Sequence, residues 1–183
     1  MNVSPAVGFL AVALLIFSSG ASLIEAQNAA KTAPGKEMAL SAKDLDSKVV
    51  PDKVFFRGQS APVQMRNTGG VHFADDFYML AMLVDNSGYS TGIREKYQAY
   101  LITEVPLEIA GQTLKPGAYG CGFLENNKFT VMDLGANDLF QATSIRDAEI
   151  KHPVPLQIVA ASDAGGKYRF YHGRDYVEFH RTK

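Results

Sequence analysis

The sequence predicts an all-β fold, a single antiparallel β-sandwich with one or two short helical turns, on three observations. Short apolar runs of strand length alternate with turn residues along most of the chain. Several of these runs alternate apolar and polar residues with a period of two, the pattern of a strand with one buried face. Neither a heptad repeat nor a tandem repeat is present. We expect about eight to ten strands, with a β-barrel as the alternative arrangement.

The composition limits the classes of function. The chain has 183 residues, of which 46% are hydrophobic and 20% are charged, a balance typical of one globular domain. It carries 18 basic and 19 acidic residues, so its net charge is -1. Nucleic-acid binding needs an excess of basic surface, which this chain lacks. We therefore expect no nucleic-acid partner.

Residues 1–26 are predicted to form a signal peptide. Their apolar run, Val7–Phe17, is too short to cross a bilayer as a helix, and small residues follow it. We favour cleavage after Ala26 over cleavage after Ala21. The mature protein is then secreted or periplasmic, with no membrane span. No Lys or Arg precedes the apolar run, so an uncleaved N-terminal membrane anchor is the alternative.

The segment after the signal peptide, residues 27–48, is interpreted as a flexible tether. It is rich in Ala, Lys and Asp and has little apolar periodicity. The β-sandwich domain is predicted to occupy residues 49–183. It begins with Val49–Phe56, an expected edge strand or entry segment because Pro51-Asp52 interrupts the apolar run.

The first half of the domain is predicted to contain a hairpin and a central strand. A half-buried strand is predicted first, because apolar residues alternate with others at Ala61, Val63 and Met65. The next segment, Asn67–Gly70, is interpreted as a hairpin turn. The run Phe77–Val84 is apolar on both faces, which predicts a central strand covered on both sides. A short buried helix is the alternative, because Met, Leu and Ala also favour helices.

The segment Asn86–Arg94 is interpreted as a loop, because it is rich in Gly and Ser. Loops on a rigid β scaffold often carry function, so Tyr89 in its middle is a candidate ligand contact. An ordinary connection is the alternative interpretation. A strand is predicted to follow at Lys96–Glu104.

The stretch Val105–Leu134 is predicted to form three consecutive strands joined by two tight turns. Gly120 and Gly122 share one face of a strand, which predicts a bulky neighbour above them or a bulge. Asn126-Asn127 predicts a hairpin turn, because Asn tolerates positive φ angles. Cys121, the only cysteine, has no partner for an internal disulfide and is predicted to be a small buried hydrophobe. A catalytic thiol is the alternative.

The C-terminal part is predicted to contain one short helix among strands. Ser144 and Asp147 have the spacing of a capping box, which predicts a helix at Ile145–Ile150. The predicted strands are Leu139–Thr143, Leu156–Ala160, Tyr168–Tyr171 and Tyr176–His180.

One pattern resembles a known family. The pattern is Ile109-x-Gly111-x-x-Leu114-x-x-Gly117-x-Tyr119, followed by a Phe-Thr-Val return strand and a closing hairpin. It resembles an uncharacterised family of exported bacterial β-sandwich domains over residues 105–181. Family members commonly place a Trp in the return strand, where this chain has Phe129. The resemblance implies the fold and export, and it implies no reaction or catalytic residue.

Chemically active residues are few. His72, Asp75 and Asp76 form the only cluster of a histidine with carboxylates, at a predicted strand end where a metal ligand or general base could sit. A solvated turn is the alternative interpretation. Zinc-binding and serine-nucleophile motifs are absent. We therefore assign no catalytic residue, metal or cofactor.

The sequence predicts a non-catalytic binding or interaction module that binds a protein or a glycan outside the cytoplasm. The candidate ligand contacts are Tyr89, His72, Asp75 and Asp76. The eight tyrosines suit sugar or peptide contacts, although cross-strand packing also explains them. One alternative is a β-barrel carrier of a small apolar ligand, suggested by Phe77–Val84. Another is a hydrolase that uses His72 with Asp75 or Asp76.

Overall fold

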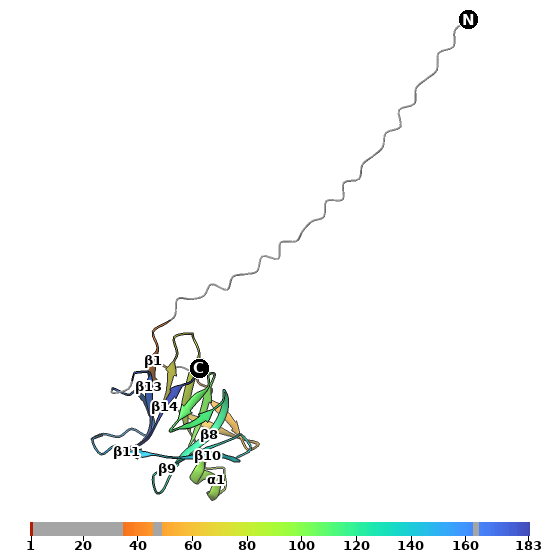
Figure 1. Cartoon of the computed structure of the whole chain (residues 1–183). Helices are drawn as coiled ribbons and strands as arrows, with labels where there is room; N and C mark the ends of the chain where they lie inside the picture. The colour runs from red at the N-terminus through yellow and green to blue at the C-terminus, as the bar shows by residue number, and fades with distance from the viewer. Residues whose placement is uncertain (2–34, 46–48, 163–164) are drawn as a thin grey trace. The chain divides into compact units, whose positions relative to one another are not determined.

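A computed structural model describes Met1 and residues 35–45, 49–162 and 165–183 (Figure 1). The predicted signal peptide and cleavage sites, and the first part of the predicted tether, lie outside these described residues. From residue 35 onward the described residues belong to one compact unit. Among them, no helix is long and apolar enough to cross a membrane.

The described residues form two antiparallel sheets and one short helix, α1 (Thr91–Lys96). The larger sheet contains, in spatial order, β1 (Met38–Ser41), β3 (Gln59–His72), β4 (Tyr78–Val84), β5 (Ala99–Thr103), β8 (Gly117–Leu124), β9 (Lys128–Met132) and β10 (Asp138–Thr143), and β2 (Lys53–Phe56) pairs with β3. The smaller sheet contains β12 (Gln157–Ala160), β13 (Lys167–His172), β14 (Asp175–Arg181), β6 (Leu107–Ile109) and β7 (Gln112–Leu114), and β11 (Ile145–Arg146) pairs with β14.

The sandwich prediction is confirmed, and the strands are more numerous than expected: the described part of the chain has fourteen. The strand order leaves both sheets open, with β1 and β10 at the ends of the larger one. The described residues therefore form no closed barrel, and the β-barrel alternative for the fold is wrong. The carrier function suggested together with the barrel stays a prediction.

Strand β4 of the larger sheet is buried on both faces. Met79, Ala81 and Leu83 of β4 belong to the core between the two sheets. The alternate residues Leu80 and Met82 belong to a second core on the opposite face. That second core is covered by the β2–β3 hairpin and by the segment before β5, which contribute Val54, Phe56, Tyr89 and Tyr97. The prediction of a central strand covered on both sides is thus confirmed.

The predicted turn at Asn67–Gly70 is wrong, because β3 runs through it. Gly69 pairs with Ala81, and Gly70 pairs with Leu80. Close packing explains the two glycines: an added Cβ at Gly70 would lie 2.6 Å from the carbonyl oxygen of Met79, and one at Gly69 would lie 3.1 Å from the backbone nitrogen of Ile158. Glycine inside a strand often marks a place where another backbone approaches closely.

The tether prediction is wrong for part of its length. Met38–Ser41 forms β1, which pairs with β3, and the side chain of Leu40 is buried. The Asp44 carboxylate accepts hydrogen bonds from the backbone N–H and the hydroxyl of Ser41, at 2.8 and 2.6 Å. This Ser–Asp pair therefore closes a turn after β1, and the ordered domain begins before residue 49.

The position of the helix was also predicted incorrectly. Ile145–Arg146 forms β11, which pairs with β14, in place of the expected helix at 145–150. The Asp147 carboxylate accepts a hydrogen bond from the Tyr171 hydroxyl at 2.9 Å, so Asp147 anchors the chain to the smaller sheet and does not cap a helix. The helix that does form, α1, lies partly within the predicted loop 86–94.

The strands at 105–134 are confirmed as β6 to β9, one more than the three we expected. Asn126 and Asn127 have φ angles of 60° and 55°, as their hairpin turn requires. Gly120 lies directly beneath the rings of Phe56 and Tyr97, which confirms the prediction of a bulky neighbour over the small residues.

Candidate functional site

The structure brings two of the three predicted cluster residues together. His72 ends β3, and its Nε2 lies 3.1 Å from Oδ1 of Asp76 in the following turn. Asp76 adopts a left-handed φ of 65°, a conformation that Asp tolerates better than most residues. The His72 ring stacks on Tyr78 with centroids 4.6 Å apart. The histidine is therefore held on two sides at the edge of the domain.

Asp75 faces away from this pair. Its Oδ1 accepts a hydrogen bond from the Arg181 guanidinium at 2.6 Å, which lowers the pKa of the Asp75 carboxyl. The same guanidinium lies over the rings of Phe73 and Phe77, at 5.4 and 5.9 Å from their centroids. Asp75 therefore fastens the C-terminal strand β14 to the turn before β4.

Metal binding is not supported at this cluster. Across the part of the chain that the structure describes, no group of three or more His, Cys, Asp or Glu side chains could hold a metal ion. His72 and Asp76 supply two such groups, and Asp75 is held by Arg181. Asp76, and not Asp75, is therefore the carboxylate paired with His72.

Tyr89 is a structural residue and not an exposed loop contact. Its side chain is buried, with 7% of the residue exposed. Its hydroxyl donates a shared hydrogen bond to the carbonyl oxygens of Phe56 and Gln59, at 3.0 and 3.1 Å. Tyr89 thus fastens the loop before α1 to the turn of the β2–β3 hairpin.

The single thiol is inaccessible. Cys121 lies in the core between the sheets with 0% of its surface exposed, and this burial raises the pKa of its thiol. A nucleophile needs the thiolate form and access to a substrate. The prediction that Cys121 is a small buried hydrophobe is confirmed.

A wide bulge in β3 provides a site that the sequence prediction missed. Val63 pairs with Val84, and Thr68 pairs with Met82. The four residues between Val63 and Thr68 therefore stand opposite a single residue of β4 and leave the regular ladder. The Thr68 hydroxyl donates to the Met65 carbonyl at 3.0 Å and fixes the shape of the bulge.

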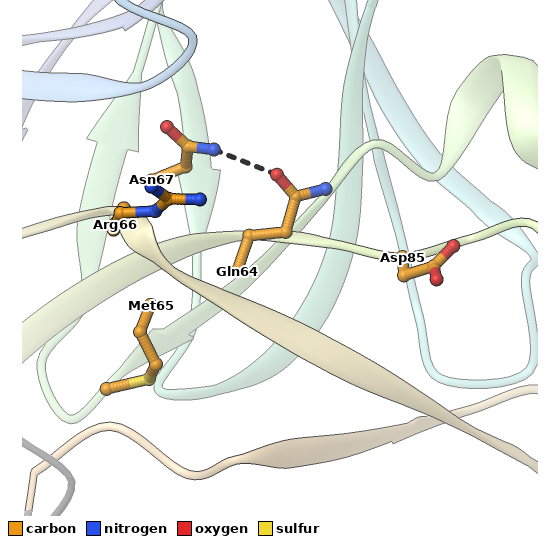
Figure 2. A pocket seen from close by; sticks show the side chains of 5 residues that line it. All are labelled: Gln64, Met65, Arg66, Asn67 and Asp85. Atoms are coloured by element: carbon orange, nitrogen blue, oxygen red, sulfur yellow. Dashed lines mark hydrogen bonds between the residues drawn. The ribbon is translucent and has the colours of Figure 1, made fainter.

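The side chains of the bulge line an open depression of about 460 Å³ (Figure 2). Its walls are Gln64, Met65, Arg66, Asn67 and Asp85. The Asn67 amide donates a hydrogen bond to Oε1 of Gln64 at 2.8 Å, as the dashed line in Figure 2 marks. Gln64 in turn donates to the carbonyl of Val84 at 3.4 Å. The polar groups are therefore oriented before any ligand binds.

A second depression of about 370 Å³ adjoins the first, and Arg66 lines both. Its other walls come from the turn after β1, from β3 and from β12: Ser41, Ala42, Lys43, Thr68, Val154, Leu156, Gln157, Ile158 and Val159. Lys43 and Arg66 are its charged residues, and no carboxylate lines it. Val154 is an exposed apolar side chain, with 42% of its surface accessible. The depression is thus basic with an apolar wall.

One sequence signal could have located this site. Gln64, Arg66 and Asn67 are long or polar side chains that precede Gly69-Gly70 within one strand-like run. An isolated glycine in a strand suggests a bulge or a close backbone approach, as well as a turn. The walls contributed by the turn after β1 and by β12 could not be found in this way, because they are distant in sequence.

Comparisons of the chain with protein-family models, with curated proteins and with solved structures give no match. The class of protein is therefore defined by the fold and by the geometry of the site. It is an antiparallel β-sandwich with a bulge in β3, whose polar side chains are already oriented by hydrogen bonds.

Proposed function

We propose that this chain is an exported, non-catalytic binding module that binds a partner protein through the bulge of β3. The observation that carries the proposal is the position of Arg66, which lines two adjoining depressions at once. β-Bulges are over-represented at functional sites, where they redirect side chains out of the sheet. The predicted signal peptide supports a location in the periplasm or outside the cell, with the N-terminal membrane anchor as the alternative.

The chemistry of the second depression suggests the kind of segment that binds there. Lys43 and Arg66 offer positive charge, and Val154 offers an exposed apolar surface beside them. A carboxylate on the partner would form charge-assisted hydrogen bonds with a guanidinium, and a neighbouring apolar side chain would cover the valine. An extended peptide segment with alternating acidic and apolar residues fits both features.

A glycan is the second candidate, at the opposite end of β3. Sugars commonly pack on aromatic faces, and neither depression at the bulge is lined by an aromatic residue. Phe77, by contrast, is 44% exposed, beside Asp76 and the Asp75–Arg181 pair. That combination of ring and polar groups favours this turn for a glycan. The hydrolase alternative has less support, because Asp75 is directed to Arg181 and not to His72.

The experiment is a titration of the chain from Gln27 onward, labelled with ¹⁵N, followed by NMR. The probe is a synthetic hexapeptide of alternating Asp and Leu, and its control is the same peptide with Asn in place of Asp. We expect the acidic peptide alone to shift the amide signals of residues 64–68 and 154–159. The variant Arg66→Ala should lose most of the response, whereas Arg146→Ala should retain it because Arg146 lies outside both depressions.

Two results would contradict the proposal. Equal shifts from the acidic and the neutral peptide would show that the positive charge does not select the ligand. A full response in Arg66→Ala would show that the bulge does not bind it. A soluble oligosaccharide forms the third arm of the experiment, and shifts confined to residues 72–78 in that arm would favour the glycan candidate.

A further inference from the structure

The β2–β3 hairpin presents an aromatic ring to solvent. Phe55 is 67% exposed, although it lies in a strand and pairs with Ser60. Its neighbours Val54 and Phe56 are buried in the second core. Successive side chains of a strand point to opposite faces, so Phe55 points to the outer face of the hairpin. A phenylalanine in water forgoes the stabilisation that its burial would bring.

The hairpin is held from beneath, which fixes the position of the exposed ring. The hydroxyl of Tyr89 donates to the carbonyls of Phe56 and Gln59, one on each side of the turn. Within the turn, the N–H of Arg57 donates to the carbonyl of Leu134 at 2.7 Å. A surface that is already rigid loses little conformational entropy when a partner binds.

The outer face of the hairpin continues along β3 to the bulge. Alternate residues of β3 are exposed over this length, namely Ser60, Pro62, Gln64 and Arg66. Figure 2 shows Gln64 and Arg66 on one side of the strand and Met65 on the other. A strand rises about 3.3 Å per residue, so Ser60 and Arg66 lie at most about 20 Å apart. Since Phe55 lies opposite Ser60, one extended segment of about six residues can contact both Phe55 and Arg66.

Cations lie at both ends of this face. Arg57 is next to the exposed ring and Arg66 is at the bulge, and neither side chain makes a hydrogen bond or ion pair within the part of the chain that the structure describes. The middle is mixed in charge. Lys53 pairs with Pro62, and the N–H of Asp85 donates to the Pro62 carbonyl at 2.8 Å. A ligand that matches this pattern is acidic at both ends and neutral between them.

We infer that the partner proposed for the β3 bulge also binds the outer face of the hairpin, as an extended segment with an apolar side chain that packs on Phe55. This inference rests on the proposed function and extends its site. Aromatic residues and arginine carry much of the binding energy of protein interfaces. A peptide can place neutral residues opposite Asp85, whereas an anionic membrane surface cannot. The charges of this face therefore favour a protein partner over a lipid surface.

The experiment compares peptides of two lengths by isothermal titration calorimetry of the chain from Gln27 onward. The short probe is the hexapeptide of alternating Asp and Leu. The long probes add Ser-Gly-Ser-Asp-Phe-Asp to its C-terminus, or the reversed segment to its N-terminus, so that either direction of the partner is covered. We expect one long probe to bind about tenfold more tightly than the hexapeptide.

Two variants of the hairpin locate the source of this gain. Phe55→Ala should remove the gain and leave the Kd of the hexapeptide unchanged. Arg57→Asn should remove part of it, and Asn suits the turn because Arg57 has a φ of 49°. The matched control is Phe77→Ala, which removes an exposed phenylalanine from the turn at the opposite end of β3 and should leave every Kd unchanged. Circular dichroism of each variant confirms that it is folded.

The possible results separate this inference from the proposed function. Equal Kd values for the short and both long probes, or a gain that survives Phe55→Ala, would overturn the inference and leave the function at the bulge intact. Binding of a long probe that depends on Phe55 but not on Arg66 would contradict the proposed function and confine the site to the hairpin. Cosedimentation with phosphatidylglycerol vesicles that Phe55→Ala abolishes would identify a membrane as the occupant and also overturn the inference.

Discussion

The ring of Tyr97 stacks on the ring of Phe56, with centroids 3.9 Å apart and planes inclined by 15°. Phe56 ends β2, and Tyr97 follows α1, so this pair joins two segments that lie 41 positions apart. Both rings lie over Gly120 of β8, where the nearest atoms to an added Cβ belong to Phe56 and Tyr97. Because Gly120 has no side chain, the rings of Phe56 and Tyr97 can pack directly on the sheet at this position.

Gly120→Ala should destabilise the protein by about 1–3 kcal/mol, because overpacking a filled core forces side chains out of their preferred rotamers. The free energy of unfolding from urea denaturation measures the effect. The control is Gly92→Ala in α1, where an added Cβ meets nothing within 4 Å. That variant should gain up to about 1 kcal/mol, because alanine favours a helix over glycine. Equal stabilities of the two variants would contradict the packing above Gly120.

Two buried tyrosines of the second core, Tyr89 and Tyr97, should respond differently to loss of the hydroxyl. Tyr89→Phe removes the donor to the carbonyls of Phe56 and Gln59 and should cost about 1 kcal/mol. The hydroxyl of Tyr97 is buried and has no hydrogen-bond partner among the described residues, and burial raises its pKa. Tyr97→Phe should therefore be neutral or stabilise by up to about 1 kcal/mol.

Thermal unfolding followed by circular dichroism distinguishes the two tyrosine variants. A midpoint that falls for Tyr97→Phe as much as for Tyr89→Phe would mean that the Tyr97 hydroxyl makes a stabilising bond. Neither substitution should change peptide binding at the β3 bulge, because neither tyrosine lines either depression.

Gly70→Ala tests whether β3 is a continuous strand at residues 67–70. An added Cβ would lie 2.6 Å from the Met79 carbonyl oxygen and 2.8 Å from Cδ2 of Leu80, so we expect a loss of about 1–3 kcal/mol in the free energy of unfolding. Urea denaturation measures this loss. If residues 67–70 instead formed an exposed turn, the substitution would change stability little, and Gly70 would not be protected from amide hydrogen exchange.

The stability should fall when the pH is lowered through 6.5, because of His172. Its ring stacks on Phe123 with centroids 5.8 Å apart, and burial lowers its pKa below the usual 6.5 of a histidine, despite the opposing charge of Asp175. Below that value the unfolded chain binds the proton more readily than the folded one, so acidification favours unfolding. Above pH 6.5 His172 is neutral in both the folded and the unfolded chain. His172 then no longer makes the free energy of unfolding depend on pH.

Urea denaturation between neutral pH and about pH 5 measures this dependence, a range in which most carboxylates remain ionised. The variant His172→Gln should show a flatter profile than the unmodified chain. A profile with the same slope in the variant would exclude His172 as the source. The exposed His152 provides the matched control, since His152→Gln should leave the slope unchanged.

Local patterns predicted the elements whose cause is local. These are the strand of the all-apolar run in β4, the Asn126-Asn127 turn and the small face of β8, and the structure confirms each of them. The errors arose where one pattern has two physical causes. Gly69-Gly70 suits a turn and also a close strand approach, and only the position of Ile158, far along the chain, selects the second.

The same distinction applies to the candidate site: contacts between neighbours in the sequence could be predicted, and contacts between distant residues could not. The nearness of His72 and Asp76 follows from their separation by one turn, so the sequence could suggest it. The pairing of Asp75 with Arg181, and the meeting of Lys43, Arg66 and Val154, join residues far apart in the chain. No local pattern contains that information.

By itself, the sequence determined that the domain folds as antiparallel β-structure, because strand periodicity and turn residues act through neighbours. It also determined that Cys121 packs as an apolar side chain, since it lies between glycines in a strand. Only the tertiary structure decided that Tyr89 is buried, that β3 carries a bulge and that β10 is an open edge. These properties depend on which strands lie side by side, and that choice is made by packing across the whole domain.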